Sequence, residues 1–272
     1  MSKQTKHVIS DQEAFFNQNA EHKKDINLDS LFSEYANKEQ WGGLDWIADK
    51  KKILEYGCGT GTSLDVFFKK RKRKEYQIYG VDIAGVAVKK AKENYPEFTF
   101  YKISNNKMPQ IKDNSLDAAF MFHVLHHTDE HQAIFDEIGK KLKKNGKFLI
   151  NDLSSNNLIN KTARNAFIHM PSFVKKKFGD DLVVGESIPE KYKVTIEEVV
   201  KKLKKAGFKV EKVGHGHLFF FVFGWVDRFI PLSKLSLIRA FYKRLIKGEE
   251  RLLHQKFFQK RTEVFFIHAV KQ

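Results

Sequence analysis

The chain has 272 residues, of which 42% are hydrophobic, so it is long and apolar enough to bury a sizeable core and is not intrinsically disordered. Its single cysteine, Cys58, cannot form an internal disulfide, which argues against a disulfide-stabilised secreted scaffold. The formal net charge of +16 fits three explanations: solvated lysine-rich faces, an anionic surface or membrane as partner, or nucleic acid.

The N-terminal region is polar and lacks an apolar signal-peptide core. No apolar run approaches the roughly 20 residues that a membrane span needs, so we expect a cytoplasmic protein. Between residues 27 and 46 the apolar spacing predicts one or two short helices. We interpret residues 1–44 as a helical N-terminal cap and residues 45–272 as the main domain.

A glycine-rich stretch follows, Gly57-Cys58-Gly59-Thr60-Gly61, between an apolar run at 52–56 and a periodic apolar segment at 62–70. This pattern predicts a strand, a turn and a helix, in which a ligand can approach the backbone closely. The glycine spacing matches neither the dinucleotide fingerprint nor a P-loop. A carboxylate just before the turn, Glu55, suits a cationic ligand group.

Asp82 stands at the end of the predicted second strand, 76–81. An acid about 20 residues beyond a glycine turn is placed to accept hydrogen bonds from a ribose diol. The alternative is that Asp82 serves as the N-cap of the next predicted helix, 84–95, which is a role that aspartate also fills well.

The remaining elements alternate between strand and helix. We predict strands at 98–103, 118–122, 147–151, 207–213 and 263–270, and helices at 129–143 and 195–206, the latter opened by a capping box, Thr195-Ile-Glu-Glu198. Strands that alternate with helices indicate parallel βαβ units and an α/β fold.

Three histidines, His123, His126 and His127, lie just past the predicted fourth strand. Ligands of open α/β sheets bind outside the carboxyl ends of the strands, so this cluster is expected near the ligand. The histidines can be structural or line the ligand site, or one can be a general base, because imidazole titrates near neutral pH. A metal site is a further reading, but no acid or cysteine at a recognisable spacing supports it, and we predict no metal.

Two segments interrupt the alternation and are interpreted as insertions, at about 153–192, with a predicted helix at 160–178, and at about 215–260. In the second, apolar residues are interleaved with lysine and arginine, especially over 218–245. That pattern suits an amphipathic helix at a membrane interface, a helical lid or core insertion, or a dimer interface.

The run Glu55-Tyr-Gly57-Cys-Gly59-Thr-Gly61 resembles the first motif of the S-adenosylmethionine-dependent methyltransferases with a Rossmann-like fold, and further landmarks of small-molecule "type 11"-like members follow over residues 45–152. The resemblance is looser from residue 194 onward. It implies a seven-stranded, mostly parallel sheet with helices on both faces, an antiparallel last strand and a long helical insertion before that strand.

The same resemblance implies S-adenosylmethionine as cofactor. In the family the acid corresponding to Glu55 faces the cofactor's amino group, the glycines carry its methionine part and the acid at Asp82 binds the ribose. The family usually has an aspartate for the adenine amino group where this chain has Ser104 and Asn105. The implied cofactor contacts are Glu55, Gly57, Cys58, Gly59, Gly61, Asp82, Ile83, Ser104, Asn105, Phe122 and His123.

The expected reaction is methyl transfer to a small-molecule or lipid-like acceptor, at oxygen, nitrogen or carbon. Phe122-His123-Val124-Leu125 stands where methyltransferases of nucleic-acid bases carry Asn/Asp-Pro-Pro-Tyr/Phe, which counts against a base acceptor. Candidate general bases are His123, His126 and His215. Two alternatives stay open: an RNA or protein methyltransferase that uses the basic surface, and a non-catalytic module that only binds the cofactor.

Overall fold

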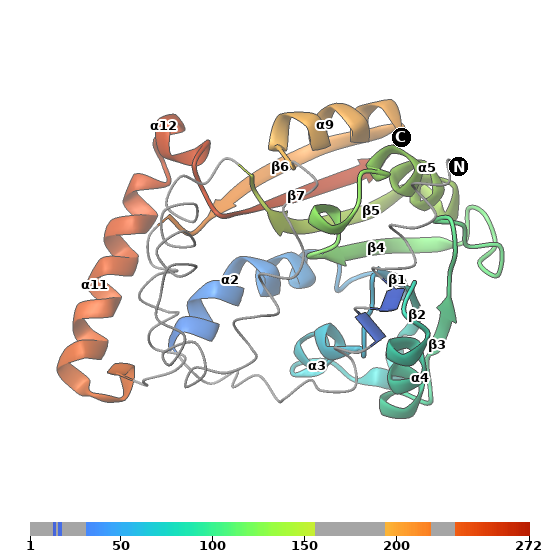
Figure 1. Cartoon of the computed structure of the whole chain (residues 1–272), viewed down its shortest axis with the longest axis horizontal. Coiled ribbons are helices and arrows are strands. Elements are labelled where there is room, and N and C mark those ends of the chain that lie inside the picture. The colour runs from blue at the N-terminus through green and yellow to red at the C-terminus, as the bar shows by residue number, and fades with distance from the viewer. Residues whose placement is uncertain (1–12, 15, 18–30, 156–193, 219–231) are drawn as a thin grey trace.

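The computed structural model describes residues 13–14, 16–17, 31–155, 194–218 and 232–272, which build one seven-stranded sheet in the order β3-β2-β1-β4-β5-β7-β6 (Figure 1). The strands are β1 Lys52–Tyr56, β2 Gln77–Asp82, β3 Thr99–Lys102, β4 Leu116–Phe122, β5 Leu142–Leu153, β6 Phe208–Gly216 and β7 Val264–Lys271. β7 pairs antiparallel with both neighbours, and the other pairings are parallel. The predicted Rossmann-like α/β sheet with an antiparallel last strand is confirmed.

Helices cover both faces of the sheet. One hydrophobic cluster joins the central strands to α3 (Thr62–Phe68), α4 (Gly85–Asn94) and the end of α2 (Leu31–Trp46). The other joins the opposite faces of the strands to α5 (His131–Lys141) and α9 (Ile196–Lys205). Strands buried on both faces are near-continuous apolar runs, which is why 52–56 and 118–122 are recognisable in the sequence.

The local sequence signals predicted most helix boundaries to within two residues of their positions in the structure. Thr195 is the N-cap of α9, as the capping-box pattern predicts, because its Oγ1 accepts a hydrogen bond of 3.3 Å from the N–H of Glu198. The N-terminal apolar positions form a single helix, α2, rather than two short ones. The 44/45 boundary falls inside this helix, and the proposed division into cap and domain stays a prediction.

β5 is longer at both ends than the predicted strand at 147–151. Leu142 pairs with Leu116 of β4, so α5 ends at Lys141 instead of residue 143. At the other end β5 continues to Leu153, opposite Val264 of β7. A long antiparallel partner supplies hydrogen bonds that extend the strand beyond its own apolar run.

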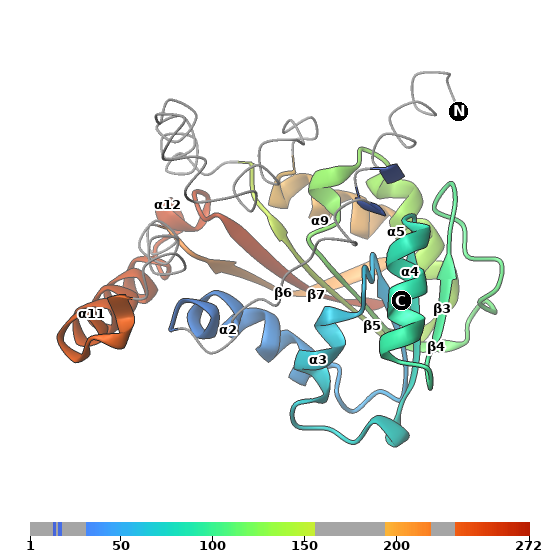
Figure 2. The same ribbon diagram turned by 60° about the horizontal axis from the view of Figure 1, so that its bottom comes forward.

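The predicted helical insertion before the last strand is present between β6 and β7, where it contains α11 (Ser236–Leu252) and the short α12 (Lys256–Gln259). α11 lies at the outer end of the molecule, beyond α2 (Figures 1 and 2). The helix expected at 160–178 and the apolar run at 219–231 lie outside the described residues. Among the described helices, none combines the length and the apolar character required to cross a bilayer.

Candidate functional site

The turn between β1 and α3 follows a left-handed path that glycine permits. Gly57 and Gly59 have φ angles of 74° and 52°, a region that residues with a Cβ rarely adopt. The N–H groups of Gly57 and Cys58 both donate to the carbonyl of Val81 in β2, at 2.8 and 3.0 Å. A Cβ on Gly57 would lie 2.4 Å from Cγ2 of Val124, whereas one on Gly59 would meet no atom within 4 Å. The turn is thus tightly packed at Gly57 and open at Gly59.

The third glycine, Gly61 (φ 85°), lies where the end of α4 packs on the turn. A Cβ there would be 2.9 Å from the ring of Tyr95. The side-chain amide of Asn94 donates to the carbonyl of Thr60 at 3.1 Å. These contacts support the turn from outside and leave its Gly59 side clear.

Asp82, the last residue of β2, holds the turn by its side chain. Oδ2 accepts a hydrogen bond of 2.8 Å from the N–H of Gly59, and Oδ1 accepts one of 2.9 Å from the N–H of Ala84. Burial raises the pKa of Asp82, and these backbone N–H groups offset part of that rise. The N-cap position of α4 belongs to Ala84, so the N-cap alternative for Asp82 is wrong. Each carboxylate oxygen keeps a second lone pair that can accept a ligand hydroxyl.

Polar side chains surround Tyr56, the last residue of β1 before the turn. Glu55 is buried, with 2% of its surface exposed, at the end of β1. The hydroxyl of Tyr56 donates to the side-chain oxygen of Asn106 at 2.8 Å, and the amide of Asn106 is bonded in turn to Glu130. Burial raises the pKa of Tyr56, so it stays a neutral donor. This chain of contacts fixes the loop after β3.

The sequence-predicted cofactor residues do not all expose their side chains at this edge. Cys58 is buried in the core cluster beneath the turn, where only its backbone belongs to the turn. Phe122 lies in the same cluster, and Ile83 packs against the opposite one. Ser104 and Asn105 are exposed on the loop after β3.

The loop after β4 begins with a residue in the left-handed region, His123, whose φ is 57°. Its N–H donates to the carbonyl of Asn151 in β5 at 2.9 Å. His123 retains solvent-accessible surface, yet the protein around it lowers its pKa by desolvation. His123 is thus open to solvent on one side and flanked by protein on the other.

Asp152, near the end of β5, anchors this loop from a fully buried position. Oδ2 accepts hydrogen bonds from the N–H groups of Val124 (2.8 Å) and Leu125 (2.6 Å), and Oδ1 lies 2.6 Å from Nδ1 of His126. Burial raises the pKa of Asp152, but His126 and the N–H groups outweigh it, so the net pKa is lowered. An ionised carboxylate only accepts, which assigns the proton to Nδ1 and leaves Nε2 of neutral His126 able to take one.

His127, the third member of the cluster, has a different environment. Its ring centroid lies 3.8 Å from that of His126 and 5.0 Å from that of Phe16, which comes from the N-terminal segment. Burial lowers the pKa of His127 to about 3, so it is neutral at pH 7. Within the residues that the structure describes, no group of three potential metal ligands is found, and the cluster is read as an acid–base and packing feature.

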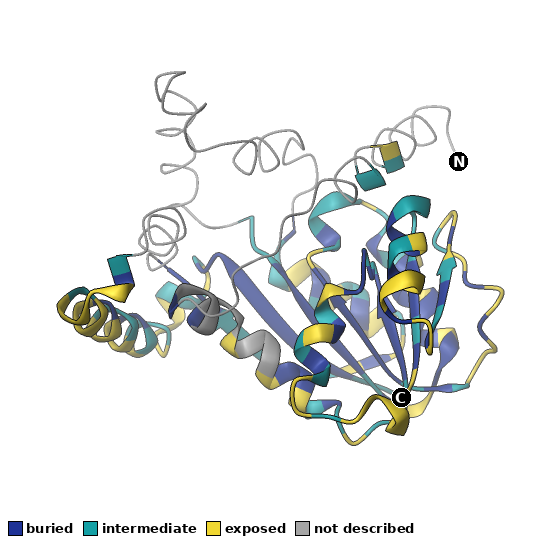
Figure 3. Cartoon of the chain, turned by 90° about the horizontal axis from the view of Figure 1, so that it is seen from below, coloured by how far each residue is buried: buried dark blue, intermediate teal, exposed yellow. Residues whose placement is uncertain are grey.

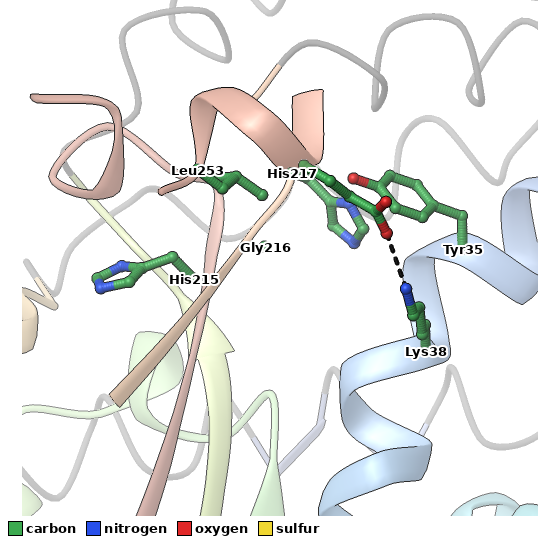
Figure 4. A pocket seen from close by; sticks show the side chains of 7 residues that line it. Tyr35, Lys38, His215, Gly216, His217 and Leu253 are labelled. Carbon is green, nitrogen blue, oxygen red and sulfur yellow. Dashed lines mark hydrogen bonds and ion pairs between the residues drawn. The ribbon is translucent and has the colours of Figure 1, made fainter. Parts of the chain in front are cut away.

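His215, the third candidate base, lies in another place. It lines a small pocket between β6, α2 and α11, together with Tyr35, Lys38 and His217 (Figure 4). Burial lowers its pKa. The structure therefore brings His123 and His126 to the loop beside the glycine turn and places His215 elsewhere, on β6, with its side chain pointing away from those of Tyr35 and Lys38 (Figure 4).

Sequence reasoning missed three participants: Tyr56, Asn106 and Asp152. Asp152 carried a usable signal, because it is an acid just past an apolar strand, as Asp82 is. The predicted strand ended at Asn151, and the aspartate was not considered. The link between Tyr56 and Asn106 spans 50 residues and has no local pattern.

Comparison with known proteins agrees with this geometry. A family model described as a methyltransferase domain matches residues 47–207. The fold is similar to that of a putative sarcosine dimethylglycine methyltransferase from Galdieria sulphuraria, at 15% identity over 96% of this chain and 98% of that one, with a TM-score of 0.58. It is also similar to magnesium protoporphyrin IX methyltransferase from Synechocystis PCC 6803 with bound S-adenosylhomocysteine, at 12% identity over 97% and 100%, with a TM-score of 0.54.

A [4+2]-cyclase has a similar fold, at 17% identity over 92% of this chain and 84% of that one, with a TM-score of 0.56. At such identities the likeness to solved structures shows the fold. No curated protein matches the sequence.

Proposed function

The chain belongs to the methyltransferase-domain family, and we propose that this S-adenosylmethionine-dependent methyltransferase acts on a small-molecule or lipid-like acceptor. We further propose that His126 is the general base. The observation that carries the proposal is the 2.6 Å contact between Asp152 and Nδ1 of His126. It lies in the loop whose Val124 packs on Gly57 of the glycine turn. A base oriented by a buried carboxylate therefore stands beside the cofactor turn.

The residues of the glycine turn fit the cofactor. When bound, S-adenosylmethionine supplies a methyl group already activated by the positive charge of its sulfonium. Glu55 would provide a buried negative charge for the ammonium group, and Asp82 would accept from the ribose hydroxyls. The open space at Gly59 would admit the ligand against the backbone. These features support the predicted cofactor contacts, with Cys58 contributing through its main chain.

His126 has the attributes of a general base. Its Nδ1–H is held by Asp152, which fixes the tautomer, orients the ring and stabilises the charge that forms when Nε2 takes a proton. His123 retains solvent-exposed surface, and His127 packs against Phe16. We assign proton removal to His126 and contact with the acceptor to His123.

The acceptor class rests on the residues of the loop after β4. This loop offers His123 and Val124 where methyltransferases of nucleic-acid bases carry an Asn/Asp-Pro-Pro-Tyr/Phe motif. The sarcosine dimethylglycine and magnesium protoporphyrin IX methyltransferases are named for small molecules, which is consistent with such an acceptor here. RNA or protein methylation, favoured by the +16 charge, and a non-catalytic module are the competing readings.

The test uses S-adenosylmethionine labelled in its methyl group, incubated with the protein and a cell extract. We expect the label in solvent-extractable or acid-soluble small molecules. Label in a precipitate that ribonuclease or protease removes would replace the proposal with the RNA or protein alternative. Micromolar binding of the cofactor by calorimetry without transfer to any fraction would support the non-catalytic module.

With an acceptor identified, His126→Gln separates the base from the binding site. We expect kcat to fall by roughly 10²- to 10⁴-fold, the typical contribution of general-base catalysis, with cofactor affinity unchanged. His127→Gln, in the neighbouring ring, is the matched control and should retain most of kcat. Equal losses in the two variants would remove the assignment of His126.

A further inference from the structure

The insertion helix α11 is fastened to the body by one side only. The hydroxyl of Tyr35 in α2 donates to Oε1 of the fully buried Glu249 at 2.9 Å. Nζ of Lys38 in α2 lies 2.7 Å from Oε1 of Glu250, the contact drawn as a dashed line in Figure 4. Around these polar contacts, Tyr242 packs on α2 in a small apolar cluster of its own. Both acidic residues of the helix, Glu249 and Glu250, therefore contact α2 on this inward side.

The opposite side of α11 exposes large apolar side chains. Leu237 is 84% exposed and Phe241 is 53% exposed, and the four-residue spacing places them on one face. Leu235, in the turn that leads into the helix, is 58% exposed. The outward side of α11 is accordingly drawn as exposed in Figure 3. Exposing such side chains to water has a cost that a partner would relieve.

Basic residues are frequent in the same segment. Exposed cationic side chains occur along the helix and just before it, and they are Lys234, Arg239, Lys243, Arg244, Lys247 and Arg251. The two acidic side chains of α11, Glu249 and Glu250, face α2 instead. We call Leu235, Leu237 and Phe241 with Lys234, Arg244, Lys247 and Arg251 the α11 face; Arg239 and Lys243 each follow one of the apolar residues by two positions and point to another side of the helix. It combines apolar groups with positive charge unbalanced by acids of its own helix.

We propose that the α11 face docks the protein on an anionic lipid bilayer, with Leu237 and Phe241 inserted at the boundary of headgroups and acyl chains. The charge and the apolar side chains together select this partner. An amphipathic helix with a basic polar part lies in such an interface by burying its apolar side and attracting anionic lipids. A nucleic acid would use the cations alone, and a second copy of the face would bring like charges together.

The topology places this surface at the same end of the sheet as the glycine turn. β6 is antiparallel to β7, which is antiparallel to β5, so β6 runs parallel to β1 and β4. The insertion leaves β6 at its carboxyl end, the edge at which the loops after β1 and β4 also lie. A docked molecule would therefore hold the carboxyl edge of the sheet on the side of the bilayer. The proposal does not depend on the identity of the methyl acceptor.

The test is co-sedimentation of the full chain with vesicles of phosphatidylcholine alone and with 30% phosphatidylglycerol added, at about 0.1 M salt. We expect binding to the anionic vesicles only. Leu237→Ser combined with Phe241→Ser should lower the partition coefficient at least tenfold. Arg244→Gln combined with Arg251→Gln should lower it by roughly 25-fold, since each cation near an anionic surface contributes on the order of a fivefold effect.

Lys70→Gln combined with Lys72→Gln is the matched control, because it removes two exposed charges from the loop after α3 at another part of the surface. We expect this variant to bind within twofold of the wild type. Four results would overturn the proposal: no sedimentation of the wild type, equal loss in the control, undiminished binding of the Leu237 and Phe241 variant, or a wild-type dimer that this variant dissociates. The variants change exposed side chains, and an unchanged melting temperature confirms that they fold.

Discussion

The loop after β1 and the loop after β4 are each tied to the sheet by an aspartate from the next strand outward. Asp82 of β2 accepts from the N–H of Gly59, and Asp152 of β5 accepts from the N–H groups of Val124 and Leu125. The first loop consists largely of glycine and offers its backbone to a ligand. The second adds the ring of His126, which the same aspartate orients. The same arrangement, a carboxylate that accepts hydrogen bonds from loop N–H groups, thus supports a binding surface in one loop and a proton acceptor in the other.

The two aspartates differ in exposure and in electrostatics: Asp152 is fully buried, whereas Asp82 keeps part of its surface exposed. Burial raises the pKa of Asp82, which has only backbone dipoles to compensate. The pKa of Asp152 is lowered, because its contact with His126 and the hydrogen bonds from backbone N–H groups outweigh the burial. The more deeply buried carboxylate has the lowered pKa, so the partners of each carboxylate decide the direction of its shift. Substitutions of the two aspartates can test that difference. The largest effect on stability is expected at Asp152, which contacts the His126 side chain as well as backbone N–H groups.

The largest effect is expected from Asp152→Ala. The change leaves two buried N–H groups without an acceptor and His126 without its carboxylate, so the free energy of unfolding should fall by roughly 3–5 kcal/mol. Urea denaturation of the variant measures this. Asp152→Asn keeps the shape and one acceptor, and should lose about half as much. A loss below about 1 kcal/mol for the alanine variant would contradict the anchoring role.

Asp82→Ala should affect ligand binding more than folding. It removes charge-assisted hydrogen bonds to the ribose, so the affinity for S-adenosylmethionine should fall by about 2–3 kcal/mol, or roughly 100-fold. Calorimetric titration of folded protein gives the value. Asp152→Asn provides the contrast and should bind the cofactor nearly normally. Unchanged affinity in Asp82→Ala would exclude the ribose assignment.

A third test compares two glycines of the same turn. Gly57→Ala would be strained by its φ of 74° and would also place a methyl group 2.4 Å from Val124, so it should lose about 2–3 kcal/mol of stability. Gly59→Ala meets open space and should lose about 1 kcal/mol from its φ alone, while weakening cofactor binding.

Thermal denaturation and titration together distinguish the two variants. Val124→Ala should restore part of the stability lost in Gly57→Ala, because it removes the atom that the new methyl group meets. An additive double variant would show that the two loops do not touch in the way described.

The smallest effect concerns pH. The folded protein lowers the pKa of His127 to about 3, against about 6.5 when unfolded. Between these values the unfolded chain binds the proton and the folded chain does not, so stability falls as pH falls below 6.5. From pH 7 to pH 5 the loss should be about 1–2 kcal/mol for this ring. His127→Asn should flatten that part of the profile in urea denaturation, and an unchanged slope would contradict the burial of the ring.

The sequence predicted the sheet elements because central parallel strands are continuous apolar runs between glycine and polar signals. It also placed Glu55, the glycines and Asp82 at one edge, since the carboxyl ends of parallel strands must meet there. The boundary of β5 was not predictable in this way, because its extension to Leu153 depends on pairing with β7, more than 100 residues further along the chain.

The sequence by itself determined the strand and helix signals, the glycine turn and the position of Asp82, because each follows from residue types within a few positions of one another. Only the tertiary structure decided that Asp152 orients His126, that His215 belongs to another pocket and that both acids of α11 face α2. The contacts of His126 and of Glu249 join residues that are 26 and 214 positions apart. A local pattern carries no information about such pairings, which are set by how the sheet and its covering helices pack.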